Sequence, residues 1–521
     1  MTLRQSRLFW WLLAAVLVAT RMCHIGILWE GDAYPLAAAR QILDGKALYR
    51  EIWFDKPPLL PLAYLLFGAL PGWPLRLAGA GYALVACRIA FGFGRELWAE
   101  REGCWAAALL GFSVCFDLPS SAIPVASDLL MWAPHLAAVW LASRRPFWSG
   151  VLAAVAFWIN PKGALVAVAC VIWNPAGIMA MAAGFAAVSA TTVAWLAGTG
   201  ALAAYGEQVW RWGRLYAASP FETTPLRNGV LRTLAWASFH AAIVVAAAWC
   251  LIKRDDVDSS TTGKLKHAPP IAQAGHALAC PEVFSASSLA SPQRNTPGVV
   301  TGWWTKVRWA AWLVLSLAGV AAGMRFFPRY YFLPLAPVVM LAARGFTLMN
   351  GRLRLAVCTL LLIPLLRFAP SYVAAARGVD WRDTAMDRDS RAACALVRTM
   401  ARPGDTLFVW GYRPEDYVYT RLPAATTYLD SQPLTGVPAD RHLTQSAPVE
   451  AEGPRARRAE LTRSAPTFIL DGLGLYNPRL AIGSYPDLRA WLENYREVGR
   501  TGGTVIYRNL ATERGARTKA M

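Results

Sequence analysis

Charged residues are scarce in this chain. Only 16% of its 521 residues are Asp, Glu, Lys or Arg, whereas soluble domains contain about a quarter. Hydrophobic residues make up 55%, and 24 of the residues are tryptophan. This composition excludes a single soluble globule and intrinsic disorder. Apolar stretches recur from residue 9 to residue 372, and this pattern predicts a polytopic α-helical membrane protein.

Patterns for metal binding, disulfides and nucleotide binding are also missing. The nine cysteines are scattered without a CxxC or Cys/His cluster, and the six histidines form no HxxxH pair. Neither a zinc site nor a disulfide framework is therefore expected. No glycine-rich phosphate loop is present. The net charge is +19, but no basic stripe on a soluble domain points to nucleic acid. The basic residues instead set the topology or face anionic lipid or phosphate.

The positive charges predict about eleven spans with a cytosolic N-terminus. The run 57–70 has 14 residues and would cover only about 21 Å of a ~30 Å core. We therefore expect it to lie on the outer surface as an interfacial helix, since counting it as a span would place Arg144 and Arg145 outside. The expected spans are 9–28, 75–94, 103–120, 128–143, the two short segments 147–159 and 163–173, 177–199, 230–252, 308–324, 331–348 and 354–371.

The composition changes after residue 372 and predicts two parts. Residues 1–372 form the membrane domain, with an outer loop at 30–74 and a flexible, polar cytosolic loop at 253–306. Residues 373–521 form a small extracytoplasmic α/β domain. In that domain we expect helices at 391–401 and 486–495, and strands at 406–410, 425–429, 467–470 and 504–507.

The outer loop after the first span carries acidic and basic residues beside apolar helices. Asp32 could cap a short helix that ends at Gly45. Alternatively, it handles a proton, because a carboxylate is costly at a membrane surface and can deprotonate a hydroxyl or amine acceptor. Lys56 precedes two prolines. It either anchors the interfacial helix by snorkelling or binds the phosphate of a lipid-linked donor.

This loop resembles the first outer loop of the GT-C membrane glycosyltransferases, in the bacterial branch related to protein O-mannosyltransferases and aminoarabinose lipid A transferases. The resemblance implies a polyprenyl-phosphate-linked sugar donor, inversion of the anomeric carbon, and an active site on the outer side of the cytoplasmic membrane. The matching residues are Asp32, Tyr34, the Ala37–Arg40 segment, Gly45, Tyr49 and Asp55-Lys56-Pro57-Pro58.

Three further positions match the family pattern. Asp128 resembles the second acidic position, although it could also cap the span that starts there. Lys162 lies at a helix break, which is tolerated at membrane depth only where it lines protein or a wet cavity. Arg329 and Tyr330 open a late span, where an Arg fork suits a phosphate and an aromatic-belt anchor is the alternative.

The resemblance implies a role for each of these side chains. Many relatives carry an adjacent Asp-Glu pair where this chain has Glu30-Gly31-Asp32, and alignment backward from Gly45 places Asp32 on the second acid of that pair rather than the first. Either Glu30 or Asp32 could therefore be the base, and we expect Asp32. The expected catalytic residues are Asp32 and Asp128, and the expected substrate-binding residues are Glu30, Tyr34, Asp55, Lys56, Lys162, Arg329 and Tyr330.

The same resemblance implies the partners and leaves two rival functions. The partners are a polyprenyl-phosphate sugar, a glycan, lipid or protein acceptor, and the lipid bilayer. No cofactor is obligatory, and the carboxylates leave room for a divalent cation. One rival is a flippase for lipid-linked sugar, which the absence of an inverted repeat disfavours. The other is a non-catalytic membrane scaffold.

Overall fold

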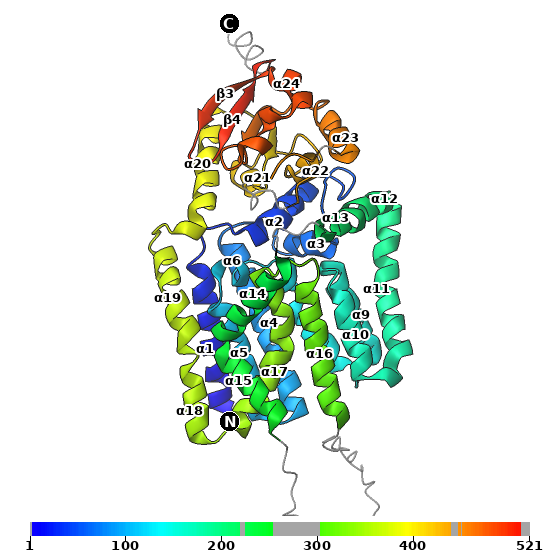
Figure 1. Ribbon diagram of the computed structural model, residues 1–521, viewed down its shortest axis with the longest axis vertical. Coiled ribbons are helices and arrows are strands. Elements are labelled where there is room, and N and C mark those ends of the chain that lie inside the picture. The colour runs from blue at the N-terminus through cyan, green and yellow to red at the C-terminus, as the bar shows by residue number, and fades with distance from the viewer. Residues whose placement is uncertain (1–2, 219–223, 254–302, 439–445, 450, 512–521) are drawn as a thin grey trace, which may run out of the picture.

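The computed structural model describes residues 3–218, 224–253, 303–438, 446–449 and 451–511. Long helices stand side by side in a bundle, and a small sheet with short helices lies across one end of it (Figure 1). Most of the expected cytosolic loop 253–306 lies outside the described residues. The bundle helices are α1 (Leu3–Met22), α4 (Trp73–Leu97), α5 (Glu100–Cys115), α8 (Trp132–Leu141), α9 (Pro146–Ile159), α10 (Gly163–Trp173), α11 (Ile178–Gly198), α14 (Pro225–Phe239), α15 (Ala241–Ile252), α16 (Trp303–Ala321), α17 (Phe332–Leu348), α18 (Gly351–Thr359) and α19 (Leu362–Ala376).

Helix α17 forms the centre of the bundle. It packs against α5, α15 and α16, and nearly all of its side chains are buried. Small residues let neighbouring helices approach closely, as is common within membranes. A Cβ atom on Gly345 of α17 would collide with the backbone carbonyl of Ala246 on α15. The position of the central helix is therefore set by direct contact between the backbones of α17 and α15.

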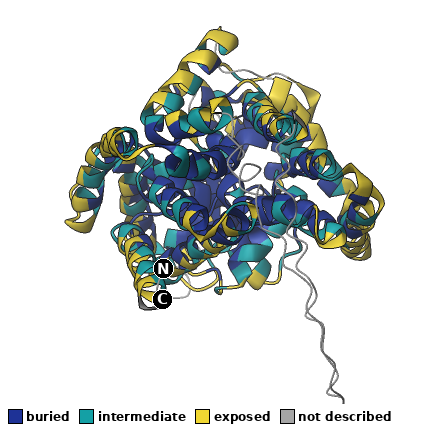
Figure 2. Cartoon of the chain, turned by 90° about the horizontal axis from the view of Figure 1, so that it is seen from below, coloured by how far each residue is buried: buried dark blue, intermediate teal, exposed yellow. Residues whose placement is uncertain are grey.

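Four helical stretches among the described residues are long and apolar enough to cross a membrane, and a bent pair of helices would make a fifth. The expected number of about eleven spans stays a prediction. Exposed residues line the outside of the bundle while buried ones fill its middle (Figure 2). Large exposed apolar side chains on this rim include Trp11, Val85, Met179, Val314 and Leu366. Such a surface is typical of contact with lipid rather than water. The four stretches are Trp73–Leu97, Pro175–Gly198, Pro328–Leu348 and Gly351–Ala376.

The segment 230–252 is not the single straight span that the sequence predicted. Helices α14 and α15 meet at 91°, and His240 lies at the corner. Two contacts hold α14 in this direction. Gly229 packs against the ring of Phe326, and Arg232 Nη1 donates to the carbonyl of Arg325 at 2.8 Å. Tertiary contacts with the 325–331 loop thus override the largely apolar pattern.

Short helices lie between the bundle and the sheet. Helix α2 ends before Gly45, whose φ of 89° suits the expected glycine stop. Helix α3 has only seven residues, too few to cross a membrane. Side chains and backbone join this layer to the sheet region: Gln41 Oε1 accepts from the Ala424 amide at 3.0 Å, and the Trp53 amide donates to the Thr427 carbonyl at 2.7 Å. The layer comprises α2 (Glu30–Leu43), α3 (Leu59–Leu65), α6 (Pro119–Ala122), α7 (Ser127–Leu130), α12 (Leu202–Tyr205) and α13 (Trp212–Ala218).

The C-terminal region contains a four-stranded sheet in the order β1-β2-β4-β3. Strands β1 and β2 are parallel, whereas β4 runs antiparallel to both β2 and β3. The first two strands are fully buried, as their apolar sequences predicted. The elements are α20 (Ala385–Met400), β1 (Leu407–Trp410), α21 (Glu415–Thr420), α22 (Gln432–Thr435), α23 (Glu452–Leu461), β2 (Phe468–Asp471), α24 (Pro486–Leu492), β3 (Tyr495–Arg500) and β4 (Val505–Asn509).

Two expectations for this region are wrong. The segment 425–429 is not a strand, because the Thr426 hydroxyl bonds to the backbone of Tyr428 and turns the chain locally. The expected helix 486–495 ends at Leu492, and Tyr495 instead begins strand β3, which the sequence did not predict. Its sequence is polar, and its side chains are largely exposed, because it is an edge strand that pairs only with β4.

Candidate active site

A cavity of about 270 Å³ lies where the bundle, the outer loop and the C-terminal region meet. Four cationic and three acidic side chains line it. Eight of the nine residues expected from the sequence are at its wall, and only Asp32 is not. The expected residues at the wall are Glu30, Tyr34, Asp55, Lys56, Asp128, Lys162, Arg329 and Tyr330.

The break between α9 and α10 brings a lysine to the carboxylate of Asp128. The Lys162 amide donates to Asn160 Oδ1 at 3.1 Å, which closes the turn at the end of α9. Lys162 Nζ lies 3.2 Å from Asp128 Oδ1 and 3.1 Å from the centroid of the Tyr330 ring. Asn160 Nδ2 donates to the same carboxylate oxygen at 3.2 Å. The broken helix therefore lines a polar cavity, as its lysine required.

Asp128 also faces the arginine that opens α17. Arg329 Nε lies 4.0 Å from Asp128 Oδ2. Asp128 is the first acidic residue of α7, but the helix receives no capping hydrogen bond from a side chain. The alternative role as a simple helix cap is therefore not what the structure shows. Asp128 holds Lys162 and Arg329 at one wall of the cavity.

The outer loop supplies a second ion pair on the cavity wall. Lys56 Nζ lies 2.9 Å from Asp55 Oδ2. The backbone carbonyl of Lys56 accepts from the Tyr49 hydroxyl at 2.7 Å, and the Tyr49 carbonyl accepts from Gln208 Nε2 at 2.7 Å. Tyr34 fixes the chain just before Asp55, since the Tyr34 hydroxyl donates to the Trp53 carbonyl at 3.1 Å. This set of bonds orients the half-buried Lys56 toward the cavity.

The loop before α17 is strained and carries two arginines. Met324 and Phe326 have positive φ angles of 51° and 47°, which cost about 1–3 kcal/mol each in a non-glycine residue and cluster at functional sites. Between them, Arg325 stacks on the Tyr216 ring at 3.4 Å. Arg329 follows four residues later. The strained backbone thus holds two guanidinium groups at the cavity.

The sequence predicted that Asp32 lies at the reaction cavity, and the structure places it elsewhere. Asp32 is fully buried and outside the cavity wall. One carboxylate oxygen accepts from Arg76 Nη1 at 2.8 Å, and the other accepts from the Tyr64 hydroxyl and the Val125 amide, both at 2.8 Å. Its carboxylate is shielded from any acceptor by these donors. Glu30, two residues earlier in α2, lines the cavity instead.

Sequence reasoning missed three of the charged or aromatic residues of the cavity wall. Arg325 and Tyr216 form one side, and Tyr412 comes from the C-terminal region just after β1. Arg325 had a weak signal, because it lies four residues before Arg329 in the sequence. Tyr216 and Tyr412 had none, since only the fold brings these distant segments to the outer loop.

The charges of the cavity shift the ionisation of its basic groups. Burial lowers the pKa of Lys162 to about 8, although the nearby Asp128 carboxylate partly opposes this effect. Burial would also lower the pKa of Lys56, but the charge and hydrogen bond of Asp55 together with the nearby Tyr216 outweigh burial, and the pKa is raised. Lys162 is thus the cavity cation that titrates closest to neutral pH.

The carboxylates of the cavity are arranged toward cations rather than toward one another. Asp55 pairs with Lys56 and Asp128 with Lys162, while the charge of Glu30 acts on Arg329. Among the described residues, no group of three or more His, Cys, Asp or Glu gathers closely enough to hold a metal ion. The described residues therefore assign no metal centre, and the expected room for a divalent cation stays a prediction.

Known proteins resemble this chain in structure rather than in sequence. No protein-family model and no curated protein sequence matches it. A crystal structure of ArnT from Cupriavidus metallidurans bound to undecaprenyl phosphate has 13% identity and a TM-score of 0.59, covering 98% of this chain and 99% of that one. The apo structure of the same ArnT has 12% identity and a TM-score of 0.54, with 98% of both chains covered.

A structure of the Archaeoglobus fulgidus oligosaccharyltransferase in complex with Zn and sulfate is less similar. It has 13% identity and a TM-score of 0.46, covering 96% of this chain and 73% of that one. The two ArnT structures are the better basis for comparison. The chain has the fold of ArnT over nearly its whole length, which confirms the helical bundle with a small sheet expected from the resemblance to GT-C membrane glycosyltransferases.

Proposed function

We propose that this protein transfers a sugar from a polyprenyl-phosphate donor to an acceptor on the outer side of the cytoplasmic membrane. One observation carries the proposal: a cavity rich in cations, with carboxylates facing it, lies at the end of the bundle next to the C-terminal region, in a chain that has the fold of ArnT. That ArnT structure contains undecaprenyl phosphate, which supports a lipid donor of the same kind. In this proposal residues 1–372 form the membrane domain with about eleven spans, and residues 373–521 form the extracytoplasmic domain.

The cations of the cavity suit a phosphate leaving group. Arg325 and Arg329 offer planar forks of donors, and Lys56 and Lys162 add point charges. As the bond from the anomeric carbon to the phosphate oxygen breaks, its electron pair stays on the phosphate. Donors already fixed by Asp55 and Asp128 stabilise that developing charge without reorganisation.

Glu30 suits the role of base better than Asp32. It lies in the first turn of α2, is half-buried and faces the cavity. A base must come within hydrogen-bond reach of the acceptor proton, and the buried Asp32 does not reach the cavity. In the proposed step, the acceptor oxygen or nitrogen attacks the anomeric carbon opposite the phosphate and its proton passes to Glu30. The configuration at that carbon is thereby inverted.

The proposal is tested with cells that lack the protein. Mass spectrometry is expected to find an accumulated undecaprenyl-phosphate sugar and a surface glycan, lipid or protein that lacks one sugar. The purified protein, mixed in detergent with lipid extract and envelope from these cells, is then expected to restore the missing mass. Micelles offer no bilayer to cross, so a flippase or a scaffold would form no product. Failure to form a covalent product contradicts the proposal.

Donor affinity is expected to depend on pH through Lys162. Its pKa of about 8 means that the ammonium is present at pH 7 and lost as the pH rises to 9. Binding of undecaprenyl phosphate should weaken by about tenfold over this range, the size expected for one lost charge pair. The probe's own phosphate titrates near pH 6, below this window. Asp128, Arg329, Lys56 and Tyr330 surround Lys162.

Binding titrations at pH 7, 8 and 9 measure this effect. In the matched variant Lys162→Arg, the guanidinium stays charged, so affinity should be nearly constant across the range. An equal loss of affinity in the wild type and in Lys162→Arg would assign the pH dependence to another group.

A further inference from the structure

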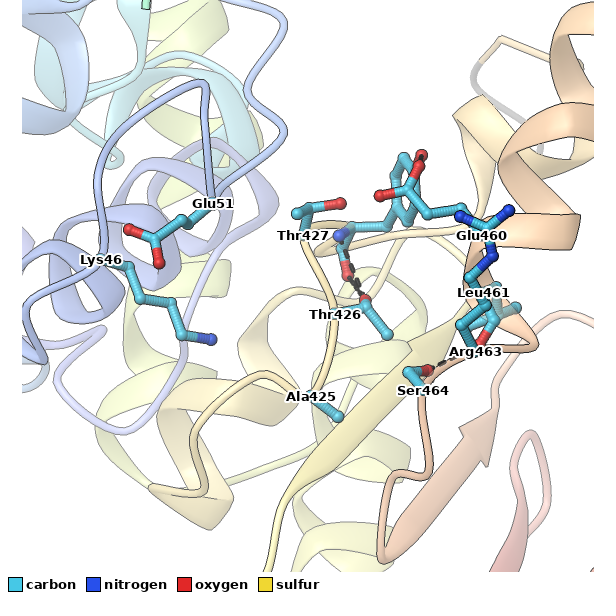
Figure 3. A pocket seen from close by; sticks show the side chains of 10 residues that line it. Lys46, Glu51, Ala425, Thr426, Thr427, Glu460, Leu461, Arg463 and Ser464 are labelled. Atoms are coloured by element: carbon cyan, nitrogen blue, oxygen red, sulfur yellow. Dashed lines mark hydrogen bonds between the residues drawn. The ribbon is translucent and has the colours of Figure 1, made fainter. Parts of the chain in front are cut away.

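A second hollow lies outside the reaction cavity, between the outer loop and the C-terminal region. It measures about 460 Å³, within the ~300–1,000 Å³ range of ligand pockets. Lys46 and Glu51 stand on one side, and the segments 425–428 and 460–464 form the other (Figure 3). We call this hollow the outer groove. Its two walls come from parts of the chain almost 400 residues apart.

The outer groove meets another hollow on the surface of the C-terminal region. This second one measures about 550 Å³ and includes Trp491, Asn494 and Asn509. The two hollows share Arg463 and Ser464. The groove surface therefore continues past this shared segment, and it offers more length than a single small molecule needs.

The lining of the outer groove carries equal numbers of positive and negative side chains beside apolar surface. Its charged residues are two cations, Lys46 and Arg463, and two carboxylates, Glu51 and Glu460. Thr426, Thr427 and Ser464 add hydroxyl groups. The reaction cavity, by contrast, has more cations than acids. A balanced lining does not favour a phosphate or another strongly charged ligand.

The two carboxylates of the groove keep capacity to accept hydrogen bonds. Glu460 Oε2 accepts from the Tyr428 hydroxyl at 2.7 Å, and Glu51 Oε2 accepts from the Ala47 amide at 2.8 Å. A carboxylate has about four acceptor sites, and hydroxyl donors to a charged oxygen form strong bonds. A ligand with many hydroxyl groups and no net charge matches this surface best.

We propose that the outer groove binds a neutral glycan, namely the saccharide portion of the acceptor. This inference rests on the proposed function and names the class of acceptor. A peptide acceptor is the competing class, and the test below separates the two. Exposed Glu51 and Glu460 bind the sugar hydroxyls from opposite walls.

The groove is connected to the reaction cavity through one aromatic contact. The Trp53 ring packs against Tyr428 at 5.8 Å between centroids, and the Trp53 amide bonds to Thr427. Two residues further along the outer loop, Asp55 and Lys56 line the reaction cavity. A glycan seated in the groove thus lies beside the loop that carries the phosphate-binding lysine.

The test measures binding to the purified full-length protein in detergent, without any donor. The probes are mannotetraose, maltotetraose, chitotetraose and a neutral octapeptide rich in Ser and Thr, each titrated by calorimetry. At least one tetrasaccharide is expected to bind saturably. The double variant Glu51→Gln/Glu460→Gln should weaken that binding at least tenfold, since glutamine keeps the shape and one acceptor but loses the charge.

Glu452→Gln is the matched control, because Glu452 is exposed on the same helix α23 as Glu460 but outside the groove. It should bind the tetrasaccharide as the wild type does. Binding of the peptide alone, no binding of any tetrasaccharide, or an affinity unchanged in the double variant overturns the proposal. Glycan binding without any covalent product in the detergent assay would refute the sugar transfer and leave the groove standing. Covalent sugar transfer without any glycan binding would refute the glycan site in the outer groove and leave the proposed sugar transfer standing.

Discussion

Substitution of Glu30 by glutamine is expected to lower the rate of sugar transfer by about 10²–10⁴-fold, the usual contribution of a general base. Glutamine keeps the size of the side chain but cannot take the acceptor proton. The rate is measured as covalent product formed by the purified variant in detergent under single-turnover conditions. Binding of undecaprenyl phosphate is expected to stay within a few-fold of the wild type, because the phosphate is held by Lys56, Lys162 and the arginines.

Asp55→Asn is the informative comparison for Glu30. Asp55 lines the same cavity but pairs directly with Lys56, so its loss should disturb phosphate binding before it disturbs proton transfer. We expect weaker donor binding and a smaller loss of the single-turnover rate at saturating donor. A Glu30→Gln variant that works at the wild-type rate, beside an inactive Asp55→Asn, would transfer the role of base to Asp55.

The sequence predicted which residues line the cavity better than it predicted which of them acts as the base. Eight expected residues meet there because acidic and basic residues beside apolar helices are retained only where a polar cavity receives them. The sequence alone could not decide between Glu30 and Asp32, because the answer depends on how α2 is oriented about its own axis. Residues two apart on a helix point about 200° away from each other, so only one of them can face the cavity. That orientation is fixed by Arg76, which lies on α4.

Other features depended on contacts between distant segments. The bend between α14 and α15 is set by packing on the 325–331 loop. Ser238 and His240 interrupt the apolar run at the corner, but two polar residues do not by themselves predict a 91° bend. Tyr412 reaches the cavity only because the layer of α2 and α3 joins the sheet region. The lengths of α4, α9, α10 and α11, by contrast, follow from apolar runs that end at charged residues, prolines or glycines.

Substitution of Arg76 by methionine is expected to destabilise the protein by about 3–5 kcal/mol, because it leaves the buried Asp32 carboxylate without its charge partner. Both side chains are almost completely buried. Arg76 also donates to the carbonyls of His24 at 3.2 Å and Ile27 at 2.6 Å, so the variant loosens the connection between α1 and α2 as well. The thermal unfolding midpoint of the purified protein in detergent measures the loss.

The double variant Arg76→Met/Asp32→Asn separates the charge from the packing. Removing both charges should recover part of the lost stability, since no unpaired carboxylate remains, while the bonds to the two carbonyls stay lost. At a temperature where Asp32→Asn remains folded, its transfer rate per folded molecule should lie within a few-fold of the wild type. A loss of transfer as large as that of Glu30→Gln, without a lower unfolding midpoint, would return the role of base to Asp32, because an acid that serves only to orient α2 cannot affect turnover while α2 stays in place.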